Sequence, residues 1–113
     1  MNKTEIPTAQ NPLEEIENLI LTIRGKQVML DRDLARLYGV ETRVLNQAVK
    51  RNIERFPDRY MLQLTDNEMV KLVTICDRFK LLKHSSSLPY AFTEHGVTML
   101  ASVLKSDIAV LQL

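Results

Sequence analysis

Four polar side chains recur at helical spacing in the segment "TRVLNQAVKR": Arg43, Asn46, Gln47 and Lys50. At about 100° per residue, these four fall on one side of a helix, while apolar residues such as Leu45 fall on the other side. Asn and Gln can each pair twice with the major-groove edge of adenine, and Arg or Lys can donate hydrogen bonds to guanine. The spacing therefore predicts a helix face that reads bases of double-stranded DNA.

Basic residues are concentrated around this polar face. Residues 24–59 carry nine Lys or Arg against five Asp or Glu, a net charge of +4, although the whole chain carries only +1. Lys and Arg that neutralise DNA phosphates supply most non-specific affinity. We assign this role to Arg36, Arg51, Arg55 and Arg59. The alternative is an ordinary helix whose polar face only contacts water.

Two consecutive helices are expected to position the polar face. Asp31 is a suitable N-cap for a helix over 32–38, and Gly39 suits the C′ position that follows it. The second helix is predicted to run from Thr42 to Glu54, because Pro57 cannot continue it. In this second helix Ile53 belongs to the apolar side. Asn52 also falls there, and it either bonds the backbone near the helix end or marks a distortion.

The junction of these helices has the spacing of a helix-turn-helix. Ala35 supplies a small residue where the helices would cross, Gly39 supplies the tight turn, and Leu45 can pack back from the second helix. Ala, Gly and Leu are common residues, so the pattern is moderately specific. Together with the polar face, it favours DNA binding over a purely solvated helix.

The rest of the chain predicts short strands and further helices. The expected elements are a helix at 13–19, a hairpin at 21–29 with its turn at Gly25, a strand at 60–64, a helix begun by a Thr65–Glu68 capping box, a strand at 90–92, a helix capped by Thr93 and a last helix capped by Ser106. The predicted class is α+β: a small domain that contains a helix-turn-helix, several helices and a small antiparallel β-sheet.

Two long blocks of the chain resemble a known family. "IRGKQVMLDRDLARLYGVETRVLNQAVKRNIERFPDRYMLQLT" and "PYAFTEHGVTMLASVLKS" resemble the ORF-six amino-terminal domain of phage and bacterial proteins, which is grouped with the KilA-N and Bro-N domains. The resemblance spans about Ile20 to Lys105. It implies a prophage-type regulator, often described as an antirepressor, with a DNA-binding amino-terminal domain. We therefore expect a flexible lead at 1–12, a single KilA-N-like DNA-binding domain at 13–113, and no carboxy-terminal partner domain.

Apolar residues near the carboxyl end suggest a second kind of function. "DIAVLQL" places Ile108 and Leu111 where a second chain could cover them, and we predict a homodimer joined from Val103 to Leu113. The predicted interface residues are Val103, Ile108 and Leu111. The alternative to DNA binding is therefore a protein-interaction or oligomerisation module that binds a repressor.

Several classes of protein do not fit the sequence. Cys76 is the only cysteine, which excludes an intrachain disulfide and a cysteine-based zinc site. No nucleophile motif or glycine-rich phosphate loop is present, so we expect no enzyme activity, no cofactor and no metal. No apolar run approaches the roughly 18 residues of a membrane helix. We expect a soluble, cytoplasmic protein that does not bind membranes.

Overall fold

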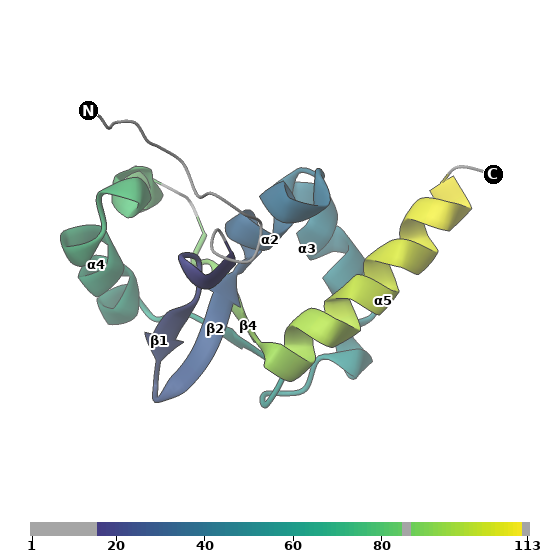
Figure 1. Cartoon of the computed structure of the whole chain (residues 1–113), viewed down its shortest axis with the longest axis horizontal. Helices are drawn as coiled ribbons and strands as arrows, with labels where there is room; N and C mark the ends of the chain where they lie inside the picture. Colours follow the sequence, from purple (N-terminus) through teal and green to yellow (C-terminus); the bar gives the residue numbers. More distant parts are fainter. Residues whose placement is uncertain (1–15, 85–86, 112–113) are drawn as a thin grey trace.

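A computed structural model describes residues 16–84 and 87–111 of the chain. Within these ranges the fold is α+β, with four helices and one four-stranded antiparallel sheet, as predicted (Figure 1). The predicted lead at 1–12 lies outside the described residues, as does the start of the predicted helix at 13–19. No helix of the described ranges is both long and apolar enough to cross a membrane.

The sheet is assembled from distant parts of the chain. Its strands are β1 (Leu21–Ile23), β2 (Lys26–Leu30), β3 (Met61–Gln63) and β4 (Tyr90–Thr93), and their order is β1-β2-β4-β3. All neighbouring pairs are antiparallel. Arg24 and Gly25 both have positive φ, 55° and 75°, as a two-residue hairpin turn requires. The predicted hairpin and both later strands are confirmed.

Four helices and two 3₁₀ segments surround this sheet. They are α2 (Asp31–Tyr38), α3 (Thr42–Arg51), η1 (Ile53–Arg55), α4 (Asp66–Ile75), η2 (Asp77–His84) and α5 (Glu94–Leu111). The predicted capping box starts α4: the hydroxyl of Thr65 accepts from the Glu68 N–H at 3.2 Å, and the Thr65 N–H donates to the Glu68 carboxylate at 2.8 Å.

Alternate residues of the strands divide the interior into two clusters. Met29 and Phe92 pack in one cluster with buried residues of α2, α3 and α5. Leu30 and Ala91 pack in the other cluster with buried residues of α4 and η2. Figure 1 accordingly shows α4 on one side of the strands and α2, α3 and α5 on the other. The helix α3, which carries the predicted polar face, and the preceding helix α2 thus share a core with α5.

The structure corrects the predicted end of the helix that begins at Thr42. The helix α3 stops at Arg51, and Asn52 caps it with φ −122°. The side-chain amide of Asn52 donates to the carbonyl of Ala48 at 2.8 Å, so this residue both bonds the backbone and marks the break. Beyond the break the helical periodicity no longer applies. Ile53 therefore leaves the apolar side and is 53% exposed.

Two other predicted helix starts are wrong. The helix α2 includes Asp31 and has Leu30 at its N-cap position, because the Asp31 carboxylate is drawn into longer-range contacts described below. Ser106 caps no separate helix, since α5 continues through it from Glu94 to Leu111.

Val103, predicted at a dimer interface, lies in the domain's own core with 1% of its surface exposed. This position leaves Val103 no surface for a second chain.

Candidate functional site

A tight connection joins α2 to α3. Gly39 ends α2 with φ 69° and ψ 30°, the left-handed conformation that the sequence predicted for it. Its N–H donates to the carbonyl of Arg36 at 3.1 Å, and the N–H of Val40 donates to that of Ala35 at 2.9 Å. These bonds use carbonyls that a helix end otherwise leaves unpaired. Thr42 then begins α3 after only three connecting residues.

The inner side of α3 is fixed in the core. Ala35 of α2 and Leu45 and Ala48 of α3 each have at most 1% of their surface exposed, and all three belong to the same cluster. Packed apolar interiors are dense, so a helix held by such residues has little freedom to rotate. The opposite side of α3 is therefore presented outward in a defined orientation.

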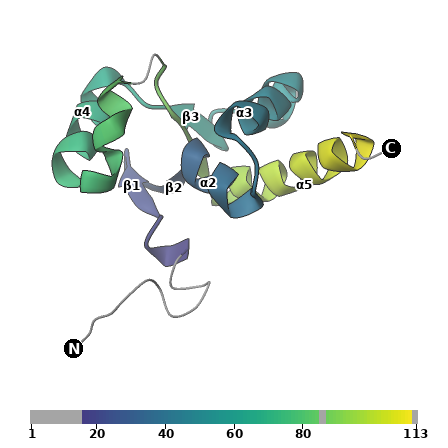
Figure 2. The same cartoon turned by 90° about the horizontal axis from the view of Figure 1, so that it is seen from above.

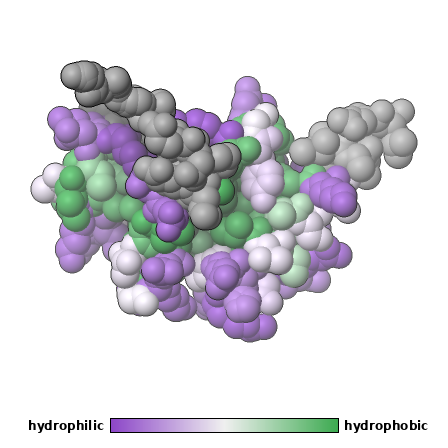
Figure 3. Space-filling model, viewed as in Figure 1, coloured by the Kyte–Doolittle hydropathy of each residue, from purple (hydrophilic) through white to green (hydrophobic). Residues whose placement is uncertain are grey.

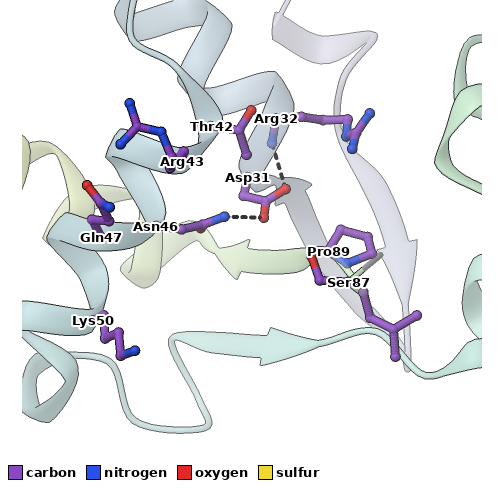
Figure 4. A pocket seen from close by; sticks show the side chains of 10 residues that line it. Asp31, Arg32, Thr42, Arg43, Asn46, Gln47, Lys50, Ser87 and Pro89 are labelled. Carbon is purple, nitrogen blue, oxygen red and sulfur yellow. Dashed lines mark hydrogen bonds between the residues drawn. The ribbon is translucent and has the colours of Figure 1, made fainter. Parts of the chain in front are cut away.

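A hollow of about 480 Å³ lies between α3 and the segment 87–89. All four predicted base-reading residues line it: Arg43, Asn46, Gln47 and Lys50. Asp31, Arg32 and Pro89 contribute to its floor and far wall (Figure 4). In that view Arg32 points to the side away from α3, and Arg43 and Gln47 point away from Asp31. The structure thus brings together residues that are up to 58 positions apart in the sequence.

Asp31 connects three elements at the floor of this hollow. Its carboxylate, 3% exposed, accepts from the side-chain amide of Asn46 at 3.0 Å and from the backbone N–H of Tyr90 at 3.2 Å. It also accepts from the N–H of Arg32 at 2.7 Å. The first residue of α2 is therefore tied to α3 and to β4. This arrangement fixes where α3 lies relative to the sheet.

The same contact changes the role of Asn46. Its amide nitrogen is bonded to Asp31, and its amide oxygen is buried without a partner among the described residues. Bidentate pairing with adenine needs both amide atoms exposed. The geometry does not support the predicted base-reading role of Asn46, because its amide nitrogen is directed at Asp31 (Figure 4) and its amide oxygen is buried. Asn46 instead holds α3 in place.

Arg43, Gln47 and Lys50 remain on the exposed side of α3. Arg43 donates to Glu41 at 3.0 Å, with 67% of the Arg43 side chain and 73% of the Glu41 side chain exposed. Exposed ion pairs contribute little to stability, since water and salt screen them. Arg43 is therefore able to leave Glu41 for a stronger anionic partner.

The four predicted phosphate-binding residues are exposed but do not line the hollow. Arg36 lies 3.5 Å from the carboxylate of Asp33, and 74% of its side chain is accessible. Arg59 lies over the ring of Tyr60 at 5.2 Å, and Tyr60 stacks on His95 in the first turn of α5. Arg51 and Arg55 follow the polar face at the end of α3 and in η1.

A buried acidic residue near the site was missed by the sequence reasoning. Asp33, 1% exposed, accepts two hydrogen bonds from Arg78 of η2, at 2.9 and 3.0 Å. The Arg78 guanidinium also lies 3.9 Å from the ring centre of Phe79. A signal was present, because Asp33 stands between Leu30 and Leu34 at the spacing of a buried helix face. An acid at such a position needs a partner.

Metal-ligating side chains are scattered over the described part of the chain. In the ranges 16–84 and 87–111, no three His, Cys, Asp or Glu side chains gather closely enough to hold a metal ion. Arg32 brings one further buried polar atom to the site, since its Nε–H finds no partner in the part of the chain described. The hollow is therefore lined by hydrogen-bonding and basic groups.

Fold and site together define a small α+β domain that presents a polar, basic helix face beside a hollow. The family model of the ORF6N domain matches residues 18–103, and the chain belongs to the ORF6N domain family. This family fits a phage-type regulatory domain. A search of curated proteins found no match, and neither did a search of solved structures.

Proposed function

We propose that the chain is a sequence-specific, double-stranded DNA-binding module of a phage- or prophage-type transcription regulator or antirepressor. In this proposal α2 and α3 act as a helix-turn-helix, and α3 enters the major groove. One observation carries it: Arg43, Gln47 and Lys50 are exposed on a helix whose other side is fixed by Leu45 and Ala48. The proposal assigns no reaction to the chain.

Each exposed residue of α3 has a definite part in this mechanism. Gln47 can pair with adenine through both amide atoms, since this residue is exposed on α3. Arg43 exchanges Glu41 for guanine or a phosphate, and Lys50 donates to guanine or a phosphate. Arg36, Arg51, Arg55 and Arg59 contact phosphates. Asn46 keeps α3 in the orientation that Asp31 sets.

The experiment that tests this proposal is binding-site selection from random duplexes with the whole chain. We expect an enriched motif a few base pairs long. Replacing Gln47 with Ala should then relax preference at one position of that motif, at a cost of about 1–3 kcal/mol. Selection that enriches no motif, or a Gln47→Ala variant with an unchanged motif, contradicts the proposal.

A protein-interaction module that binds a repressor is the second candidate function. Val70 and Ile75 of α4 are 61% and 75% exposed, and hydrophobic residues reach the surface in the region of α4 (Figure 3). Exposed apolar surface can form part of an interaction site. The dependence of binding on salt concentration distinguishes the two candidate functions. DNA binding weakens steeply as salt rises, whereas apolar contacts between proteins do not.

A further inference from the structure

Two further hollows adjoin the one described above. A hollow of about 260 Å³ lies between α3 and the strands β3 and β4, and another of about 530 Å³ follows it. Asn46 and Lys50 line both the first and the second hollow. Ile53, Met61 and Tyr90 line both the second and the third. The three hollows thus adjoin one another through shared lining residues, and we call them together the α3 groove.

The α3 groove has an excess of positive charge. The basic residues that line it are Arg24, Lys26, Arg32, Arg43 and Lys50, and the acidic ones are Asp31 and Asp58. Asp31 is buried, and its oxygens are occupied by three N–H donors. Arg24 is held by Glu68 at 2.7 and 2.8 Å, so among the described residues Lys26 and Asp58 are the other charged groups that line that end. The positive excess is therefore concentrated at the end lined by Arg32, Arg43 and Lys50, where it attracts a polyanion, and Lys26 adds one cation at the other end.

The middle of the groove is apolar. Tyr90 and Met61 are half-buried there, and Ile53 is 53% exposed where α3 has ended. A sugar–phosphate backbone combines anionic phosphates with the apolar faces of deoxyribose. Protein contacts to both phosphate and sugar fix the register of a protein on a duplex. Cations at the ends and an apolar centre match this chemistry, and they give exposed Ile53 a partner.

We infer that the α3 groove holds the sugar–phosphate backbone of one DNA strand beside Lys50, while Arg43 and Gln47, which point away from Asp31, contact base edges of the same duplex (Figure 4). This inference rests on the proposed function and adds to it a second surface that contacts DNA. Arg32 and Lys26 hold phosphates at the two ends of the groove. Arg32 near the start of α2 and Lys50 on α3 both line the first hollow, so the strand passes between these two cations.

The slope of log K against log salt tests the two cations directly. On the duplex found by selection, Arg32→Gln and Lys26→Gln should each make the slope shallower by about 0.9, the value for one phosphate contact. Each should weaken binding to unrelated duplexes in the same proportion. Lys71→Gln is the matched control, since Lys71 is exposed on α4 and lines none of the three hollows. Its slope should equal that of the wild type.

A second pair of variants tests the middle of the groove. Ile53→Glu places a carboxylate against the strand and should weaken duplex binding about tenfold, a loss of about 1.4 kcal/mol. Ile53→Gln has a similar size without the charge and should lose much less. Ile53 is exposed, so thermal melting of both variants should stay close to that of the wild type. A loss of binding in Ile53→Glu with normal melting then reports on the groove.

The outcomes separate this inference from the proposed function. Unchanged slopes in Arg32→Gln and Lys26→Gln, in a chain that still selects a motif, overturn the inference alone. A changed motif in either variant also overturns it, because a backbone contact carries no sequence preference. Tighter binding of a single-stranded oligonucleotide than of the duplex overturns it too. A wild-type chain that binds no duplex overturns the inference and the proposed function together.

Discussion

At the scale of residues, the polar side chains around α3 divide into those that hold the helix in place and those that are presented to solvent. Asp31 is buried and bonded to the half-buried Asn46, and Asp33 is buried against Arg78. Arg43 and Lys50 reach solvent from the same helix. Replacing a residue that holds the helix in place changes the geometry of the surface. Replacing a residue that is presented to solvent changes only what the surface can bind.

Replacing the presented cations should weaken DNA binding without unfolding the chain. Lys50→Ala and Arg43→Ala each remove a charge that faces the duplex, and each should lower affinity about tenfold. Neither side chain is buried, so the free energy of unfolding should change by less than about 0.5 kcal/mol. Titration of a labelled duplex measures the first quantity, and urea denaturation measures the second. Unaltered affinity in the double variant contradicts major-groove binding by α3.

The ion pair between Arg24 and Glu68 predicts how stability depends on pH. Hydrogen bonds from the Arg24 guanidinium hold the pKa of Glu68 at about 2, below its ordinary value of 4.5. A carboxylate whose pKa is lower in the folded state stabilises the fold above its unfolded pKa. That contribution is lost as pH falls from about 4.5 to 2.

Glu68→Gln should therefore make stability less dependent on pH in this range. Gln can still accept from the Thr65 N–H and keep the capping box, so the variant removes mainly the charge. Free energies of unfolding measured at pH 6, 4 and 3 should fall less steeply in Glu68→Gln than in the wild type. Parallel pH profiles for the two proteins contradict the role given to this ion pair.

At the scale of elements, local chemistry and distant contacts set different boundaries. Thr65 and Glu68 start α4 as the sequence predicts, because both partners of the capping box lie within one turn. The end of α3 was missed, since the Asn52 amide turns back to Ala48 before Pro57 takes effect. Asp31 was taken for an N-cap because its partners, on α3 and β4, lie 15 and 59 residues away.

The candidate site was predictable to a similar extent. Helical periodicity placed Arg43, Gln47 and Lys50 on the exposed side of α3, because that face depends only on local spacing. Asn46 shares the spacing but not the exposure, since a buried carboxylate from α2 captures it. The groove joins α3 to β3 and β4, so no local pattern in the sequence contains it.

The connection between α2 and α3 predicts the cost of a substitution at Gly39. Gly39→Val forces a β-branched side chain into φ 69°, which should destabilise the fold by about 1–2 kcal/mol or more. No atom of the described residues lies within 4 Å of a Cβ placed there, so the cost comes from the backbone conformation. Chemical denaturation measures it, and Gly39→Asn serves as control because Asn tolerates this conformation better. Equal stability of Gly39→Val and the wild type would contradict the left-handed conformation of Gly39 in this turn.

At the scale of the whole molecule, the last turns of α5 extend beyond the rest of the described chain in both views (Figures 1 and 2). Leu100, Val103 and Leu104 anchor the first part of α5 in the core. The predicted interface residues Ile108 and Leu111 fall in the extending part, and their side chains lie outside what the structure describes. A helix that extends from a domain in this way can pair with a second copy.

We predict a homodimer through this part of α5, with α3 free in each subunit. Two recognition helices could then meet successive major grooves about 34 Å apart. Ile108→Asp combined with Leu111→Asp should give monomers and abolish cooperative binding to a paired site. Sedimentation at micromolar concentration measures the assembly, with Ser102→Asp, an exposed position of α5, as control. A monomeric wild-type chain contradicts this prediction.

The strand order has a consequence for when the protein becomes functional during its synthesis. The inner strand β4 pairs with both β2 and β3, yet it is made some 60 residues after β2. Until β4 leaves the ribosome, Asp31 lacks the N–H of Tyr90, and the apolar side of α3 lacks Phe92 and α5. Pairing between such distant segments folds slowly. A nascent chain therefore gains a fixed α3 only when nearly all of the domain has been translated.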